Sequence, residues 1–278
     1  MIEKFGFRKA RSLLPKRSAS QNKTHGGKTL IVAGSRGMFG AAVLSATAAA
    51  RMGSGYVTLL TDKAFPSHRH PDFLIATSAG LADWKFSALA IGPGLGTSPR
   101  SARLLAQALK LAPPRVVLDA DALNLSAQRK LSPFPTSWIL TPHEGELARL
   151  LGVSSRTIHE RRAYYARLAQ KKLGCIVLLK GHRTLVATPD RVIEVESGNA
   201  ALAKAGTGDV LTGMIAGLLA QGLAPTDAAC LAAFLHGHLA DQWIRKRDPL
   251  TLMASGLLDL LPTELRRLRV GRRKPIGR

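Results

Sequence analysis

The chain has 278 residues, of which 46% are hydrophobic, and this suits one large α/β domain that needs no disulfides to hold its core. Two cysteines, no charge-free apolar run of about 18 residues, and no apolar segment behind the basic N-terminus argue against a disulfide-stapled secreted domain, a membrane span and a secretory signal. We therefore expect a cytoplasmic protein, and its most unusual property is a net charge of +22.

Short β-branched apolar runs alternate with helical patterns through most of the chain. In chain order we expect strands at 29–33, 56–61, 88–91, 115–118, 138–140 and 175–179, followed by a hairpin from 183–187 and 191–195. Expected helices cover 40–51, 101–111, 144–151, about 154–173, 208–221, 225–245 and 254–260. This alternation predicts an α/β fold with three layers, in which helices cover both faces of a central, mostly parallel sheet.

The basic residues gather at the two ends of the chain. Residues 1–28 hold eight lysines and arginines, and residues 264–278 hold seven. We expect a basic N-terminal tail at 1–27, a catalytic domain at 28–262 and a basic C-terminal tail at 263–278. Both tails are expected to be solvated, and residues 1–24 and 271–278 to be dispensable for catalysis. The alternative is a patch that binds nucleic acid or acidic lipid, but no aromatic residues interleave the basic runs and no RNA- or DNA-binding signature is present.

The sharpest local motif is AGTGD at 205–209, which opens an apolar helix. Glycines let the backbone approach a ligand, and the free amides of a first helical turn attract an anion. Asp209 then lies beside a transferring phosphoryl group and can accept a proton from an attacking hydroxyl. The equally weighted alternative is that Asp209 only caps the helix.

Other polar or glycine-rich segments follow expected parallel strands. They are GSRGMFG at 34–40, which is neither a dinucleotide fingerprint nor a Walker A loop, GPGLG at 92–96, DADALN at 119–124, TPHEGE at 141–146 and KGHRT at 180–184. Asp119 and Asp121 could bind Mg²⁺ through water or cap the following turn, while His143 lies among carboxylates. Because parallel strands end at one edge of a sheet, the segments together predict a ligand site there.

These sequence segments, together with GNAALAKAGTGDVLTGMIAGLLAQG at 198–222 and FLHGHLAD at 234–241, resemble those of the ADP- or ATP-dependent NAD(P)H-hydrate dehydratases of the ribokinase-like superfamily. The resemblance runs from Thr29 to Leu261 in the family's order. It implies repair of hydrated NADH and NADPH (NADHX and NADPHX), by phosphorylation of the C6 hydroxyl and elimination of phosphate. Bacterial members of the family typically use ADP, and eukaryotic members use ATP.

The resemblance also assigns roles by position. Asp209 matches the catalytic aspartate, which also contacts the substrate. The anion hole matches Gly206, Thr207 and Gly208. Substrate contacts match Ala41, Gly94, Gly96 and His143. The nucleotide site matches Lys180, Gly181, His182, Arg183, Thr184 and Gly208.

The resemblance further implies Mg²⁺ and ADP (or ATP), with no resident metal ligands among the site residues. A homo-oligomer, for example a tetramer, is expected. A functional partnership with a separate NAD(P)HX epimerase is also expected, because the match leaves no room for the epimerase domain of many bacterial relatives. The sequence departs from the family at Glu144, where proline is common, and at Lys204-Ala205, where many members carry Thr-Gly. A lysine at this place should favour phosphate.

Two other functions compete with this reading. A kinase of the same fold, acting on a small vitamin-precursor alcohol such as a hydroxyethylthiazole, would share the GTGD loop but not TPHEGE and GPGLG in this arrangement. A nucleic-acid-binding protein would account for the charge, but it would leave the glycine-rich loops unexplained.

Overall fold

The computed structural model describes residues 2–16, 18, 20, 22–61, 72–76, 85–110 and 114–270. Ten strands form one sheet in the order β1-β10-β9-β8-β7-β6-β5-β2-β3-β4, and all neighbours are parallel except those of β9. The strands are β1 (Ile2–Phe5), β2 (Lys28–Val32), β3 (Tyr56–Leu60), β4 (Leu74–Ala76), β5 (Ala88–Ile91), β6 (Val116–Leu118), β7 (Ile139–Leu140), β8 (Ile176–Leu179), β9 (Leu185–Ala187) and β10 (Val192–Val195).

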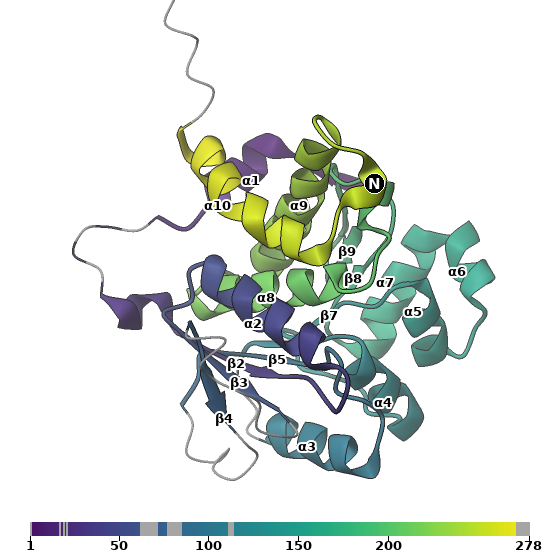
Figure 1. Ribbon diagram of the computed structural model, residues 1–278. Helices are drawn as coiled ribbons and strands as arrows, with labels where there is room; N and C mark the ends of the chain where they lie inside the picture. Colours follow the sequence, from purple (N-terminus) through teal and green to yellow (C-terminus); the bar gives the residue numbers. More distant parts are fainter. Residues whose placement is uncertain are drawn as a thin grey trace, which may run out of the picture.

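Helices cover both faces of this sheet (Figure 1). They are α1 (Phe7–Leu13), α2 (Phe39–Arg51), α3 (Pro99–Lys110), α4 (Asp121–Arg129), α5 (Glu144–Leu151), α6 (Ser155–Glu160), α7 (Arg162–Leu173), α8 (Thr207–Ala220), α9 (Pro225–Ile244) and α10 (Ala254–Val270). One apolar core joins the sheet to α2, α8, α9 and α10, and the other joins it to α3, α4, α5 and α7. The expected three-layer α/β fold with a mostly parallel sheet is therefore confirmed.

The central strands are buried on both faces, as their unbroken apolar runs predict. All four residues of β5 and of β8 are buried. The register of β9 and β10, with Val192 opposite Ala187, confirms the expected hairpin. The turn at 180–184 follows β8, which is parallel to β7, and therefore lies at the same sheet edge as the loops that follow the other parallel strands.

Two small-residue helices pack closely beneath the site. In α8, a Cβ added to Gly213 would overlap the carbonyl oxygen of Ser45, and one added to Gly217 would lie 2.7 Å from the carbonyl oxygen of Ala49. The glycines of α8 therefore let the alanine-rich α2 approach without a gap. This contact fixes the start of α8 relative to the first glycine-rich loop.

The ends of the chain differ from the expected tails. Residues 2–5 form β1, which pairs in parallel with β10, and Phe5, Ala10 and Leu14 are buried in the core. At the other end α10 continues through Pro262 to Val270 and buries Leu268. The prediction of solvated tails is wrong for these segments because their sparse apolar residues pack on α9 and the sheet edge; residues 271–278 lie outside the described part of the chain.

Smaller differences concern helix limits. The expected helix at 154–173 is divided into α6 and α7 at Arg161, whose φ of −140° is not helical. Ser154 caps α6 through the amide of Thr157, as expected. The helix α4 was not predicted, although Asp121 begins it. None of the helices in the described ranges has the length and apolar character needed to cross a membrane.

Candidate active site

Loops that follow the carboxyl ends of neighbouring strands meet at one sheet edge, as the sequence predicted. The amide of Gly34, after β2, donates to the carbonyl of Pro93, after β5, at 2.9 Å. The amide of Gly96 in turn donates to Oδ2 of Asp121, beyond β6, at 2.7 Å. The loops therefore form one connected surface rather than separate turns.

The AGTGD segment places an uncapped helix end at this surface. Gly206 is the N-cap of α8 with a left-handed φ of +90°, and no side chain caps the helix there. A Cβ at Gly206 would lie 2.9 Å from Leu44 Cδ1 and 3.0 Å from Ala254 Cβ, so this position requires glycine by conformation and by space. The first-turn amides and the positive end of the helix dipole are left to stabilise an anion.

Side chains beneath the helix end hold its backbone in place. Thr207 donates its hydroxyl to the carbonyls of Leu202 and Lys204 at 2.8 and 2.9 Å. Nε2 of the buried His236 lies 2.9 Å from the carbonyl oxygen of Thr207. Burial lowers the pKa of His236 to about 4, so the ring is neutral at pH 7 and this nitrogen carries the proton that it donates.

Asp209 is the third residue of α8 and does not cap it, because the N-cap is Gly206. Its pKa is raised from 3.8 to about 7, first by burial and then by the nearby charge of Asp119, while Lys180 opposes the rise. A carboxylate with this pKa can both accept and release a proton near neutral pH. Asp209 therefore does not cap the helix, and its pKa is that of a group able to exchange a proton near neutral pH.

A buried charge network lies next to Asp209. Lys180 Nζ donates to Asp119 Oδ1 at 2.7 Å and lies 3.6 Å from Glu146 Oε2, while Thr212 donates to Asp119 Oδ2 at 2.6 Å. Burial alone would lower the pKa of Lys180, but the carboxylates more than offset it and the net pKa is raised. Lys180 is therefore a fixed cation. A Cβ built on Gly208 would lie 3.6 Å from its Nζ, so Lys180 faces the anion hole.

A cavity of about 670 Å³ opens in front of the anion hole. Its lining includes His143, Lys180, Gly181, His182, Thr184, Thr207 and Gly208, together with residues 197–200 and His236. Cavities of several hundred Å³ commonly hold a cofactor or nucleotide. The structure thus brings together all but one of the residues that the sequence assigned to a nucleotide. The exception is Arg183, which lies outside this lining, is mostly exposed and pairs with Glu194 at 3.4 Å.

The residues assigned to the hydrate come from α2, from the loop after β5 and from the loop before α5. Ser45 donates to the carbonyl oxygens of both Ala41 and Asp209 at 3.0 Å, which ties α2 to the start of α8. Gly94 has a φ of +56°, and a Cβ there would lie 2.9 Å from the carbonyl oxygen of Met38. His143 also lines the cavity, but its Nδ1 accepts from the amides of Gly145 and Glu146, and this caps α5.

Arg162 holds the nucleotide turn from behind. Its guanidinium donates to the carbonyl oxygens of Leu179, Lys180, His182 and Arg183, and its Nε lies 3.0 Å from Oε1 of Glu144. A Cβ at Gly181 would lie 2.6 Å from Arg162 Nη2, so the glycine makes room for this side chain. One arginine therefore joins the 180–183 turn to the loop that carries His143.

Comparison with known proteins identifies the family of this chain. The model of the NAD(P)H-hydrate dehydratase family matches residues 29–263. The chain belongs to the NAD(P)H-hydrate dehydratase family. Over 236 residues it is 42% identical to the ADP-dependent (S)-NAD(P)H-hydrate dehydratase of Neisseria meningitidis, and the match covers 81% of this chain and 80% of that protein.

Other relatives of this dehydratase family agree. A bifunctional NAD(P)H-hydrate repair enzyme of Moorella thermoacetica is 40% identical, but the match covers 93% of this chain and 53% of that protein, so the chain spans about half the length of such relatives. The ADP/ATP-dependent NAD(P)H-hydrate dehydratase from Bacillus subtilis, crystallised with ATP/Mg²⁺, superimposes with a TM-score of 0.85 and 34% identity over 96% of this chain and 99% of that one. Dehydratases are lyases, so the predicted enzyme class is confirmed.

A hydroxyethylthiazole kinase from Pyrococcus horikoshii shares only the fold, with a TM-score of 0.65 and 17% identity. The low identity means that this likeness gives no support to the predicted alternative of a small-alcohol kinase. The dehydratase family is the one that the chain's own sequence matches.

The departures from the family pattern have structural explanations. Glu144 forms an ion pair with Arg162 and also lies 3.1 Å from His159 Nδ1. Lys204 directs its ammonium to the carbonyl oxygen of Leu250, which is exposed, rather than to the anion hole. Ala205 is exposed and is not among the residues with positive φ, so its methyl causes no strain.

Sequence reasoning missed three residues of this dehydratase site. Arg162 and His236 act on backbone carbonyls, and Thr212 holds Asp119 from the second turn of α8. A signal existed for Thr212, since a polar residue inside the apolar α8 needs a buried partner. Arg162 lies among many exposed cations of α6 and α7, and nothing in its spacing separates it from them.

Proposed function

We propose that this chain restores NADH and NADPH from their hydrated forms with ADP or ATP, and that Asp209 is the general base. The observation that carries this proposal is a carboxylate with a pKa of about 7 in the first turn of the uncapped helix α8, whose Thr207 and Gly208 line a nucleotide-sized cavity. A base, an anion hole and a fixed cation are the groups that phosphoryl transfer to a hydroxyl requires.

The reaction divides into two balanced steps. Asp209 accepts the proton of the C6 hydroxyl while the hydroxyl oxygen attacks the terminal phosphorus of the nucleotide. One phosphoryl group is transferred from the nucleotide to this oxygen, and AMP or ADP leaves. The C6–O bond of the phosphate ester then breaks, a proton leaves C5, and the double bond of the reduced nicotinamide ring forms with release of phosphate. The amides of Thr207 and Gly208 and the ammonium of Lys180 stabilise the charge on the moving phosphoryl group.

The two substrates occupy adjoining sites in this proposal. The nucleotide lies in the 670 Å³ cavity against Lys180, Gly181, His182 and Thr184, and the hydrate lies against Ala41, Gly94, Gly96 and His143, which also lines that cavity. The hydrogen bonds from Ser45 to the carbonyl oxygens of Ala41 and Asp209 support this placement, because they hold α2 against the first turn of α8.

Mg²⁺ bound to the phosphates of the nucleotide fits this site. No group of three metal-ligating side chains occurs within the described ranges. Mg²⁺ that is held mainly by phosphates needs only one or two carboxylates and keeps several waters. Asp119 and Asp209, which interact through their charges, would face it, and it would neutralise phosphate charge there.

Further parts of the proposal concern the setting. We expect a cytoplasmic enzyme, a homo-oligomer, and a separate NAD(P)HX epimerase as functional partner; the long bifunctional relatives support the last of these. Size-exclusion chromatography with light scattering tests the oligomer, and a monomer at micromolar concentration would contradict it.

Product analysis separates this function from that of a small-alcohol kinase. The protein is incubated with hydrated NADH, Mg²⁺ and ADP, and ³¹P spectra are followed. The proposal predicts AMP and inorganic phosphate in equal amounts and no persistent phosphate ester. A stable ester on the hydrate, or phosphorylation of hydroxyethylthiazole without reaction of the hydrate, would refute it.

A further inference from the structure

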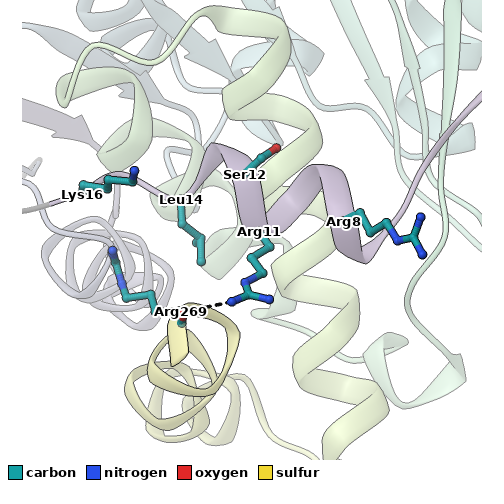
Figure 2. A pocket seen from close by; sticks show the side chains of 6 residues that line it. All are labelled: Arg8, Arg11, Ser12, Leu14, Lys16 and Arg269. Carbon is teal, nitrogen blue, oxygen red and sulfur yellow. Dashed lines mark hydrogen bonds between the residues drawn. The ribbon is translucent and has the colours of Figure 1, made fainter. Parts of the chain in front are cut away.

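A second cavity, of about 600 Å³, lies between α1 and the C-terminal part of α10 (Figure 2). It is lined by Arg8, Arg11, Ser12, Leu14, Lys16 and Arg269, so four of its six lining residues are cations and none is acidic. It shares no lining residue with the cavity at Thr207 and Gly208. A guanidinium nitrogen of Arg11 reaches the carbonyl oxygen of Arg269 at 3.5 Å and joins the two helices (Figure 2).

Cations close to this cavity are neutralised, whereas those that line it are not. Lys9 pairs with Glu3, and Arg267 pairs with Glu264 at a buried carboxylate. Within the described ranges, no carboxylate lies at ion-pair distance from Arg8, Arg11, Lys16 or Arg269. Like charges held around one hollow repel each other, and this repulsion grows as salt is lowered.

The fold does not require these four charges. Their side chains are exposed, and α1 and α10 are held to the core by Ala10, Leu14 and Leu268 instead. Unpaired cations around a cavity that packing does not need indicate an anionic ligand. The guanidinium group of arginine matches phosphate oxygens in particular, because each guanidinium can donate two parallel hydrogen bonds.

We propose that this cavity binds a small soluble polyanion with condensed phosphate groups. The volume suits a ligand of that size rather than a macromolecule. No aromatic residue lines the cavity, so it offers no surface for stacking a base, as a single-stranded nucleic-acid site would. This inference does not depend on the reaction at Asp209.

Calorimetric titration of the full chain with tripolyphosphate tests the proposal, at low and at moderate salt. A triple variant, Arg11→Gln, Lys16→Gln and Arg269→Gln, is compared with a control that removes the same charge elsewhere, Arg129→Gln, Lys171→Gln and Lys172→Gln. We expect one site whose affinity falls about tenfold or more in the first variant and less than about threefold in the control. Unchanged melting temperatures show that both variants are folded.

Three results would overturn the proposal. Equal losses in the two variants would mean that net charge alone attracts the probe. An unchanged affinity in the cavity variant would place the probe elsewhere, for example at the anion hole. No binding of tripolyphosphate, with binding of a single-stranded oligonucleotide or of anionic vesicles through the same residues, would assign the surface to a different ligand class.

Discussion

Replacement of Asp209 by asparagine should have opposite effects on turnover and on stability. Asparagine keeps the size and hydrogen bonding of the side chain but cannot accept the hydroxyl proton, so kcat should fall by roughly 10²–10⁴. The parent carboxyl has a pKa raised from 3.8 to about 7 by burial and by Asp119. Ionisation of this carboxyl therefore costs more free energy in the folded protein than in the unfolded chain. The asparagine variant has no carboxyl at this position and avoids that cost.

The sign and pH range of the stability effect follow from that shift. Below pH 4 the carboxyl is protonated in both states, so the two proteins should be equally stable. Between pH 4 and pH 7 only the unfolded parent ionises, and the parent loses stability relative to the variant; above pH 7 the difference is constant. Since one pKa unit corresponds to roughly 1.4 kcal/mol, the variant should gain on the order of 2–4 kcal/mol at pH 8.

Steady-state kinetics and denaturant unfolding at pH 4, 6 and 8 measure both effects. In the parent, kcat/KM should rise with pH as the base ionises and should level off above a pKa of about 7. The matched control is Asp227→Asn, which removes a first-turn carboxylate from α9, outside the cavity, and should leave turnover unchanged. Nearly normal turnover of the Asp209 variant, or a loss of stability at pH 8, would refute the role of Asp209 as a base.

Other predictions concern the turn and the chain's first elements. Arg162→Lys should raise the nucleotide KM about tenfold and the hydrate KM much less, because lysine cannot donate to several carbonyls at once. Arg183→Ala should change neither KM by more than about twofold, because this side chain pairs with Glu194 outside the cavity. Equal effects of the two substitutions in steady-state kinetics would contradict this. Deleting residues 2–14 should lower the free energy of unfolding by several kcal/mol, since burial of Phe5 and of Leu14 stabilises by about 1.5–3 kcal/mol each; an unchanged unfolding midpoint in denaturant would contradict it.

The middle of the fold was predictable because its strands are short, fully apolar and bounded by glycine or polar turns. The hairpin at β9 and β10 and the helix α8 followed from local patterns alone. The ends were not predictable in this way. In β1 the strand is four residues long with two charges, and only the partner β10 makes it a strand. In α10, Pro262 gives a stop signal that tertiary packing overrides.

The site shows the same division between local and distant signals. The loop positions could be predicted because parallel strands end at one edge, and the resemblance supplied their roles. The pairing of Lys180 with Asp119 joins residues that are 61 positions apart and directly follow β8 and β6, with β7 between these strands. No spacing rule reveals such a pair. The raised pKa of Asp209 likewise depends on burial and on the nearby charge of Asp119, which Lys180 opposes.

One measurement tests the central claim most directly. Purified protein is mixed with hydrated NADH and Mg²⁺, with ADP, with ATP or without nucleotide, and the absorption band of the reduced coenzyme is followed. The proposed function predicts recovery of that band with a nucleotide, none without it, and recovery slowed by roughly 10²–10⁴ in the Asp209→Asn variant. No recovery with either nucleotide, or equal recovery in the variant, would contradict it.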